Sequence, residues 1–270
     1  MPWFPDFVSA VQLARRQNQA DPVGQYLWAL SEGDAHALED VWPGKVVVHD
    51  PRAGEVRGHR QLKQFVDRNR RWLAGHVVRT DMVSATYADG RAVVELLAHL
   101  SGDGPDRTWP VAVVAESPND LSVLFRTYCS QQPVDGRRHV RPPILARGTA
   151  RPDDVVGRHT AAVAAGDAES ATDTFTGDGY FREPIGPDPV HRGAAELRSF
   201  FTRRLADGGI DSQSCAITDD GVRCAVEYNI VGWGGHELTP QAGIAVYERS
   251  PDGLLAAVRV YDDVEPPLGT

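Results

Sequence analysis

The chain has 270 residues, of which 41% are hydrophobic and 24% are charged, with a formal net charge of −9 and a pI near 5.4. This length allows two domains of ordinary size, each able to bury a core of its own. The hydrophobic fraction excludes a disordered chain. The acidic balance argues against nucleic-acid binding, because such surfaces depend on clustered lysine and arginine.

The apolar segments and the cysteines bear on location. No apolar run approaches the roughly 20 residues that cross a bilayer, and the N-terminus lacks the pattern of a secretory signal, so we expect no membrane contact. Cys129, Cys215 and Cys224 are odd in number and lack metal-ligand spacing. We therefore expect no disulfide framework, no metal site and a reducing, cytoplasmic location.

The chain repeats itself at an offset that fits a duplicated domain and is too long for a solenoid. The first match lies 133 positions apart (166 − 33). Later offsets drift by a few residues, as insertions in hairpin loops would produce. The matched pairs include Gly33–Asp34 with Gly166–Asp167, Arg57–Gly58 with Arg192–Gly193, Glu95 with Glu227, and Arg126 with Arg259.

Each copy shows the same order of elements. Two helices with apolar residues three and four apart are separated by Gly–Asp, and a strand ending in an acid and a proline follows. An Arg–Gly turn leads into an amphipathic helix, and strands joined by hairpin turns complete the copy. The expected helices are 23–32, 35–41, 59–73, 155–165, 168–175 and 194–205, and the expected strands of the first meander are 77–87, 91–100, 109–116 and 121–130.

Helices followed by an antiparallel meander predict an α+β fold. We expect one domain at 1–130, a linker rich in proline and arginine at 131–152, and a second domain at 153–270.

Two pairs of short motifs carry a family resemblance. They are Val48–Pro51 with Val56–Gly58 in the first copy, and Phe181–Pro184 with His191–Gly193 in the second. With the element order, they resemble the SnoaL-like branch of the nuclear transport factor 2-like superfamily, over roughly 21–130 and 153–264. The resemblance implies two tandem cone-shaped domains, each a curved, mostly antiparallel sheet wrapped around about three helices. It also implies an apolar pocket for proton chemistry without a cofactor, as in polyketide cyclases, ketosteroid isomerases and limonene-type epoxide hydrolases.

The second copy holds the richer set of candidate residues. The catalytic candidates are Glu227, Glu183 and Asp262, and the pocket-binding candidates are Tyr180, Asn229, Trp233 and Tyr261. Acids between apolar strand neighbours suit acid/base work, because burial raises the pKa of a carboxyl group.

Structural roles compete with these assignments. A strand-end Glu183 would pair with Arg192, and Asp262 would be a solvated tail residue together with Asp263. Strand alternation puts Glu227 on the face opposite Val226, Tyr228 and Ile230, and that face either lines the pocket or is exposed.

The first copy has fewer candidates. Its pocket-binding candidates are Asp50, Glu95, His99 and Tyr128. His49 and Asp50 are strand neighbours on opposite faces, so at most one of them lines a pocket. Tyr128–Ser130 stands where the second copy has Tyr261–Asp263, which removes the terminal acid.

No nucleophile elbow, phosphate loop or dinucleotide fingerprint occurs in the sequence. We expect a cofactor-independent cyclase, isomerase or epoxide hydrolase of specialised, polyketide-type metabolism, acting on a small apolar or polyketide-like molecule. The alternative is a non-catalytic tandem module that binds a ligand or a protein. We also expect the copies to form an intramolecular pseudo-twofold dimer, with a homodimer as a further possibility.

Overall fold

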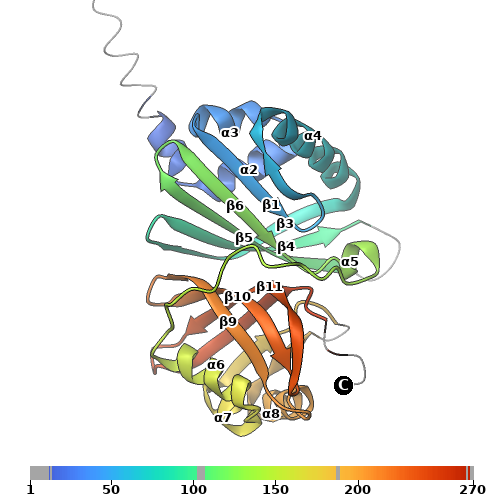
Figure 1. The fold of residues 1–270 in the computed structure, drawn as a ribbon, viewed down its shortest axis with the longest axis vertical. Coiled ribbons are helices and arrows are strands. Elements are labelled where there is room, and N and C mark those ends of the chain that lie inside the picture. The colour runs from blue at the N-terminus through green and yellow to red at the C-terminus, as the bar shows by residue number, and fades with distance from the viewer. Residues whose placement is uncertain (1–11, 13, 102–106, 187–188, 266, 268–270) are drawn as a thin grey trace, which may run out of the picture. The chain divides into compact units, whose positions relative to one another are not determined.

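The computed structural model describes residues 12, 14–101, 107–186, 189–265 and 267. The chain divides into two compact units. The first comprises 1–85, 89–108 and 113–127, and the second comprises 86–88, 109–112 and 128–270. Each unit contains a six-stranded mixed sheet with helices (Figure 1), so the expected α+β class is confirmed.

The two sheets have the same topology. The first has the order β2-β1-β6-β5-β4-β3, and the second has the order β8-β7-β12-β11-β10-β9. In each, the strand that follows the first two helices pairs in parallel with the last strand, as β1 with β6 and β7 with β12. This identity of strand order is what a duplicated domain predicts.

The elements associated with the first sheet follow the predicted order. They are α2 (Pro22–Glu32), α3 (Ala35–Val41), β1 (Lys45–Asp50), β2 (Gly54–Arg57), α4 (Gly58–His76), β3 (Val77–Ala88), β4 (Arg91–Leu100), β5 (Arg107–Asn119) and β6 (Ser122–Tyr128). A short helix, α5 (Gln132–Asp135), comes next in the chain.

The second sheet repeats this series. Its elements are α6 (Val155–Ala165), α7 (Ala168–Asp173), β7 (Phe175–Arg182), β8 (Val190–Arg192), α8 (Gly193–Arg204), β9 (Ile210–Asp219), β10 (Arg223–Trp233), β11 (His236–Arg249) and β12 (Leu255–Asp262). The expected helix over 168–175 ends at Asp173, because Phe175 begins the strand β7.

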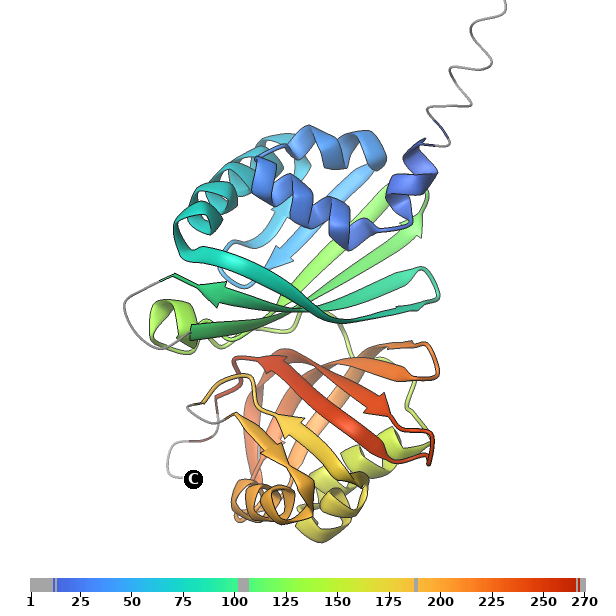
Figure 2. The ribbon, with the colours of Figure 1, turned by 180° about the vertical axis from the view of Figure 1, so that it is seen from behind.

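In each unit the helices cover one face of the sheet (Figure 2). The amphipathic helix α4 buries Leu62, Phe65 and Val66 on this side, and α8 buries Leu197, Phe200 and Phe201. Among the described residues, no helix combines the length and the apolar character needed to cross a membrane.

The repeated Gly–Asp pair ends one helix and begins the next. Gly33 and Gly166 are C-caps in the left-handed region, at φ 78° and 73°. Asp34 and Asp167 follow as N-caps, whose carboxylates accept hydrogen bonds from backbone N–H groups in the next helix. Glycine reaches positive φ at little cost and aspartate is a favoured N-cap, so two residues set the angle between the helices.

A triad of arginine, glutamate and arginine crosses three neighbouring strands in both sheets. In the second sheet, Arg259 Nη1 lies 3.0 Å from Glu248 Oε2, and Arg223 Nε lies 3.7 Å from the same oxygen. In the first sheet, Glu116 lies 2.9 Å from Arg126 and 3.3 Å from Arg91. Arg126 and Arg259, which match in the repeat, are therefore each the buried partner of a partly exposed glutamate.

The cores of the two units differ at equivalent positions. In the first unit, the rings of Tyr26 and Phe125 stack at 4.4 Å, and Trp42 meets Phe125 edge-on at 5.9 Å. At the repeat-equivalent positions the second unit has His159, Val258 and Phe175. Valine in place of phenylalanine leaves space between the helices and the sheet.

Replacing Glu248 with glutamine should destabilise the second unit. The Arg259 side chain is 2% exposed, so its charge would lose its carboxylate while remaining largely buried. We expect the free energy of unfolding to fall by roughly 2–3 kcal/mol. This is less than the cost of breaking a fully buried ion pair, because Glu248 is partly exposed to solvent. Denaturant unfolding measures this change.

The matched control is the double variant Glu248→Gln/Arg259→Met, which removes the buried charge as well. It should recover part of the loss, giving a non-additive cycle. If the stability losses of the single variants add up in the double variant, or if Glu248→Gln is as stable as the wild type, the triad does not stabilise the second unit.

Candidate active site

A cavity of about 120 Å³ lies inside the second unit. Its wall is mostly apolar and includes Phe200, Phe201 and Trp233. Apolar cavities with a few convergent polar groups are the usual form of small-molecule sites. The groups that bear on its chemistry are Tyr228, Asp262, Arg204, Glu183 and His159.

A hydrogen bond between a phenol and a carboxylate defines the polar part of this cavity. Tyr228 Oη donates to Asp262 Oδ2 at 2.6 Å, and both residues are buried. Burial raises the pKa of Asp262, although the hydrogen bond from Tyr228 acts in the opposite direction. Burial and the Asp262 charge together raise the pKa of Tyr228 well above 10. The pair thus holds a carboxyl group that is easier to protonate than an exposed aspartate.

Glycine on the strand between them allows this pair to meet. Gly243 on β11 pairs with Tyr228 on β10 and with Asp262 on β12. A Cβ atom at Gly243 would come within 2.6 Å of the Tyr228 ring and 2.8 Å of the Asp262 Cβ. No neighbour can yield easily at such separations, so the phenol crosses β11 only because position 243 has no side chain.

Arg204 brings a positive charge to the same cavity from the end of α8. Its guanidinium lies 4.1 Å from the centre of the Trp233 ring, a cation–π distance. Burial lowers the pKa of Arg204, while the carboxylates of Glu183 and Asp262 raise it. Guanidinium groups stay protonated in proteins, so the cavity contains a fixed cation beside a titratable acid.

Glu183 lines the cavity, but its observed partner differs from the expected one. Its Oε1 lies 2.9 Å from His191 Nε2. Arg192 instead lies over the Tyr180 ring at 4.6 Å and donates to the carbonyl of Asp178. The expected pairing of Glu183 with Arg192 is therefore wrong, because Arg192 is paired across the strands with Tyr180, three residues before Glu183.

His159 is a buried, neutral base at the cavity wall. Burial lowers its pKa to about 4. The Thr174 hydroxyl donates to the carbonyl of Ala171 at 2.6 Å and lies 2.9 Å from His159 Nδ1. Since that hydroxyl proton is already used, Nδ1 is the donor and Nε2 is left as the basic nitrogen.

Glu227 and Asn229 do not line this cavity. Their strand neighbours Tyr228 and Ile230 do, so alternation along β10 places the two predicted residues on the opposite face. That face is nevertheless buried, with Glu227 2% exposed and hydrogen-bonded to Tyr128 Oη at 2.7 Å. The alternative that this face is exposed to solvent is therefore wrong, and the alternative that it lines a pocket does not hold for this cavity.

The segment predicted as a linker contributes to this burial. Asn229 Nδ2 donates to the carbonyl of Leu145 at 3.0 Å. Backbone hydrogen bonds also join Gly148 to Ser214 and Ala242 to Arg141.

Asp263 also anchors the first part of this segment and the residue before it. Its carboxylate accepts hydrogen bonds from Ser130 Oγ, Gln131 N and His139 N at 2.5, 2.9 and 2.6 Å. Asp262 and Asp263 are both buried, which corrects the expectation of a solvated tail.

Tyr180 and Tyr261 do not line the cavity. Tyr180 Oη accepts a hydrogen bond from Arg259 at 3.0 Å. Arg182 lies over the Tyr261 ring at 4.9 Å. The predicted pocket role of these two tyrosines is replaced by contacts with arginine, whereas Trp233 does line the cavity.

The first-copy candidates are dispersed rather than gathered. Glu95 is fully buried and accepts a hydrogen bond from Ser84, and His99 Nε2 lies 2.9 Å from Asp81. Asp50 lines a different cavity, in the first unit, and holds the following turn through two backbone N–H groups. The wall of the cavity at Asp50 includes neither Glu95 nor His99.

Sequence reasoning missed Tyr228, Arg204 and His159. For Tyr228 a signal was present, because Val226, Tyr228 and Ile230 form an apolar alternation of the kind that faces a core. Arg204 stands in the last turn of a helix, where arginine is usually solvated. His159 lies in a helix among small residues, without a motif around it.

Replacing His159 with phenylalanine should make the second unit less sensitive to acid. Below its ordinary pKa of 6.5 the unfolded chain protonates this histidine, whereas the folded protein resists until about 4. The free energy of unfolding therefore falls as the pH drops from 6.5 towards 4, by roughly 3 kcal/mol once the histidine is protonated in both states. Unfolding measured between pH 7 and 4 should show a smaller loss for the variant.

The exposed His236 provides the control, and His236→Phe should leave the acid dependence as in the wild type. Parallel stability curves for the wild type and His159→Phe would contradict the neutral, buried state of His159.

Comparison with known proteins gives one family match and several structural neighbours. Residues 156–258 match the SnoaL-like domain family. No curated protein matches the chain. Among solved structures, an NTF2-like protein of unknown function from Cytophaga hutchinsonii is 15% identical over 43% of this chain and 93% of its own, with a TM-score of 0.33.

Two further solved structures have related names. A protein of Sinorhizobium meliloti described as a polyketide cyclase candidate is 17% identical over 41% of this chain and 94% of its own, with a TM-score of 0.35. The epoxide hydrolase/cyclase-like enzyme SalBIII, of pyran ring formation in salinomycin, is 21% identical over 40% of this chain and 86% of its own, with a TM-score of 0.33. The resemblance inferred from the motifs agrees with the match of residues 156–258 to the SnoaL-like domain family, and the two sheets, alike in strand order, fit a tandem arrangement.

Proposed function

We propose that the second unit binds a small, mostly apolar molecule in its cavity and catalyses a cofactor-independent proton transfer on it. This is the chemistry of the cyclase, isomerase and epoxide-opening reactions that the SnoaL-like match suggests. The observation that carries the proposal is the buried hydrogen bond between Tyr228 and Asp262, at 2.6 Å in an otherwise apolar cavity. Perturbed acids in such cavities mark functional sites.

Asp262 is the proposed proton-exchanging group. Its raised pKa brings the carboxyl closer to neutral pH, where a general acid or base is most effective. Tyr228 donates to Oδ2, and the backbone N–H of Val264 lies 3.3 Å from Oδ1. These two contacts fix the orientation of the carboxyl group and leave each oxygen a lone pair for the substrate proton.

Arg204 is the proposed electrostatic partner. When Asp262 removes a proton from an enolisable carbon or a hydroxyl group, negative charge develops on a substrate oxygen. A preorganised guanidinium in a water-poor cavity stabilises such charge strongly. Return of the proton from Asp262 to another atom completes an isomerisation or a ring closure with no electron acceptor required.

The first copy does not repeat this set. At the positions equivalent to Tyr228, Asp262 and Arg204 it has Leu96, Cys129 and Asn69. Its core is filled by the stack of Tyr26 and Phe125. We therefore assign the proposed activity to the second unit, and to the first a role without proton chemistry of this kind.

The cysteines bear on where the activity would take place. Cys129, Cys215 and Cys224 are thiols that form no disulfide. Thiols suit a reducing compartment, so we place the proposed activity in the cytoplasm.

The variant Asp262→Asn tests the assignment. Asparagine keeps the shape and still accepts the Tyr228 hydrogen bond, but it exchanges no proton. Turnover of an enolisable polyketide-like ketone or an apolar epoxide should fall by about 10²–10⁴-fold. Because Asp262 has a raised pKa, wild-type kcat/KM for a base-catalysed reaction should rise with pH at values above the ordinary aspartate range.

Glu227→Gln is the matched control, since Glu227 is a buried acid on the opposite face of the same sheet. Its turnover should stay near that of the wild type. An active Asp262→Asn protein, or loss of turnover only in Glu227→Gln, would remove Asp262 from the mechanism.

The variant Val258→Phe tests whether the cavity is the binding site. Val258 lines the cavity, and the first copy already accommodates phenylalanine at the equivalent position 125. The larger ring should occupy the cavity and abolish binding of an apolar fluorescent probe, with a change in stability below about 3 kcal/mol. Fluorescence titration and thermal unfolding measure the two effects.

The reciprocal variant Phe125→Val is the control. It should open a void in the first unit, lower stability by on the order of 2 kcal/mol and leave probe binding to the second unit intact. Full probe binding by a folded Val258→Phe protein would exclude this cavity as the site.

A further inference from the structure

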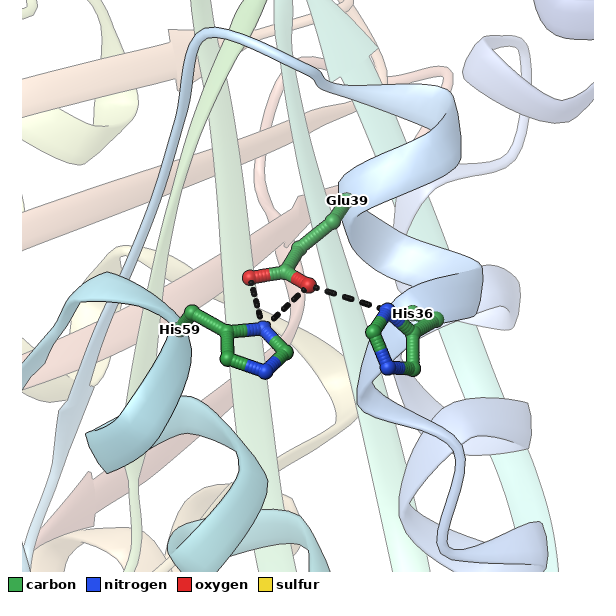
Figure 3. A group of neighbouring side chains, drawn as sticks. All are labelled: His36, Glu39 and His59. Carbon is green, nitrogen blue, oxygen red and sulfur yellow. Dashed lines mark hydrogen bonds and ion pairs between the residues drawn. The ribbon is translucent and has the colours of Figure 1, made fainter.

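Three ligand-type side chains meet in the first unit, outside the cavity described above (Figure 3). His36 and Glu39 lie one turn apart on α3, and His59 lies in the first turn of α4. Their ligand atoms all lie within 4.8 Å of one another. Residues three apart on a helix share a face, so α3 presents its two groups together toward His59.

Glu39 stands between the two imidazoles. Its Oε2 lies 2.8 Å from His59 Nδ1 and 3.5 Å from His36 Nδ1. The two rings are 5.0 Å apart between centroids. Figure 3 shows the carboxylate of Glu39 facing both Nδ1 atoms.

We propose that His36, Glu39 and His59 bind a divalent transition-metal cation, with Zn²⁺ the best match. Two imidazole nitrogens and one carboxylate are a ligand set that Zn²⁺ accepts in tetrahedral geometry, with water in the fourth position. Ligand atoms about 2.0–2.1 Å from a tetrahedral ion lie roughly 3.3 Å apart. The two Glu39 separations of 2.8 and 3.5 Å bracket this value, and the two histidine nitrogens lie within 4.8 Å of each other, so side-chain rotations complete the site.

There is room for the remaining ligand. Glu39 and His59 line a cavity of about 210 Å³, whose wall also includes Lys45 and Leu62. The side chains of His36 and His59 are 69% and 54% exposed, so an ion reaches them directly from solvent. Glu39, at 27%, is the more buried ligand and is held by α3.

The cluster is not part of the duplicated scaffold. At the equivalent positions the second copy has Glu169, Thr172 and Ala194, yet it builds the same helices and the same sheet. Exposed pairs of this kind contribute little to folding. The fold therefore does not need these three side chains, and metal binding accounts for their convergence. The cluster matches no metal motif, because its residues are spaced 3 and 20 positions apart along the chain (39 − 36 and 59 − 39).

Competitive titration of Zn²⁺ against a chromophoric chelator tests the proposal, using the tag-free full-length chain. The wild type should take up one equivalent, and His36→Ala, Glu39→Gln and His59→Ala should each weaken binding by at least ~10-fold. Zn²⁺ should also raise the melting temperature of the wild type, because an ion that binds only the folded state stabilises it. The double variant His36→Ala/His59→Ala should show neither effect.

The control is His76→Ala, which removes another exposed histidine of the same unit, at the end of α4. It should bind Zn²⁺ as the wild type does. Circular dichroism of the metal-free proteins shows whether each variant folds, and the conservative Glu39→Gln carries the test if an alanine variant does not. No stoichiometric binding by the wild type, or unchanged affinity in folded ligand variants, overturns the proposal.

Discussion

The second unit is organised around an acid held against a phenol in an apolar cavity. Burying either group alone would cost several kcal/mol, so Tyr228 and Asp262 are tolerated because they satisfy each other. Their bond in turn requires Gly243 on the strand between them, since any side chain there would strike the tyrosine ring. A glycine inside a central strand weakens the sheet, but here its missing side chain makes room for the polar pair.

The two copies show how one scaffold supports two different cores. Helix caps, the Arg–Gly turn and the Arg–Glu–Arg triad recur in both, and they lie at helix ends and on the strands. The turn uses glycine for the same reason each time, because Gly58 and Gly193 have φ values of 73° and 76°. With the frame held by these features, the side chains between sheet and helices were free to diverge into a filled core and a hollow one.

Sequence patterns predicted most of the frame but only part of the site. Helix and strand periodicity, with glycine and aspartate at the boundaries, places nearly every element, because these signals are local. Which face of β10 meets the helices is a tertiary property. The sequence pattern favoured the polar face of β10, which contains Glu227, as the site of chemistry. The apolar face lines the cavity instead, and its polar atom is the hydroxyl oxygen of Tyr228. Asp262, a catalytic candidate from the sequence, lies at the cavity wall, whereas the approach of Arg204 depends on how α8 ends against Trp233.

The buried acidic residues of the second unit have different roles, which follow from their hydrogen-bond partners. Asp263 accepts hydrogen bonds from three donors at residues 130, 131 and 139, so its carboxylate serves to anchor the chain. Glu227 is hydrogen-bonded to a tyrosine hydroxyl and does not line the cavity. Asp262 combines burial with access to a cavity, and its backbone donor is a long one at 3.3 Å. A carboxyl group so placed can change its protonation state without breaking the fold, which is the property that acid/base catalysis requires.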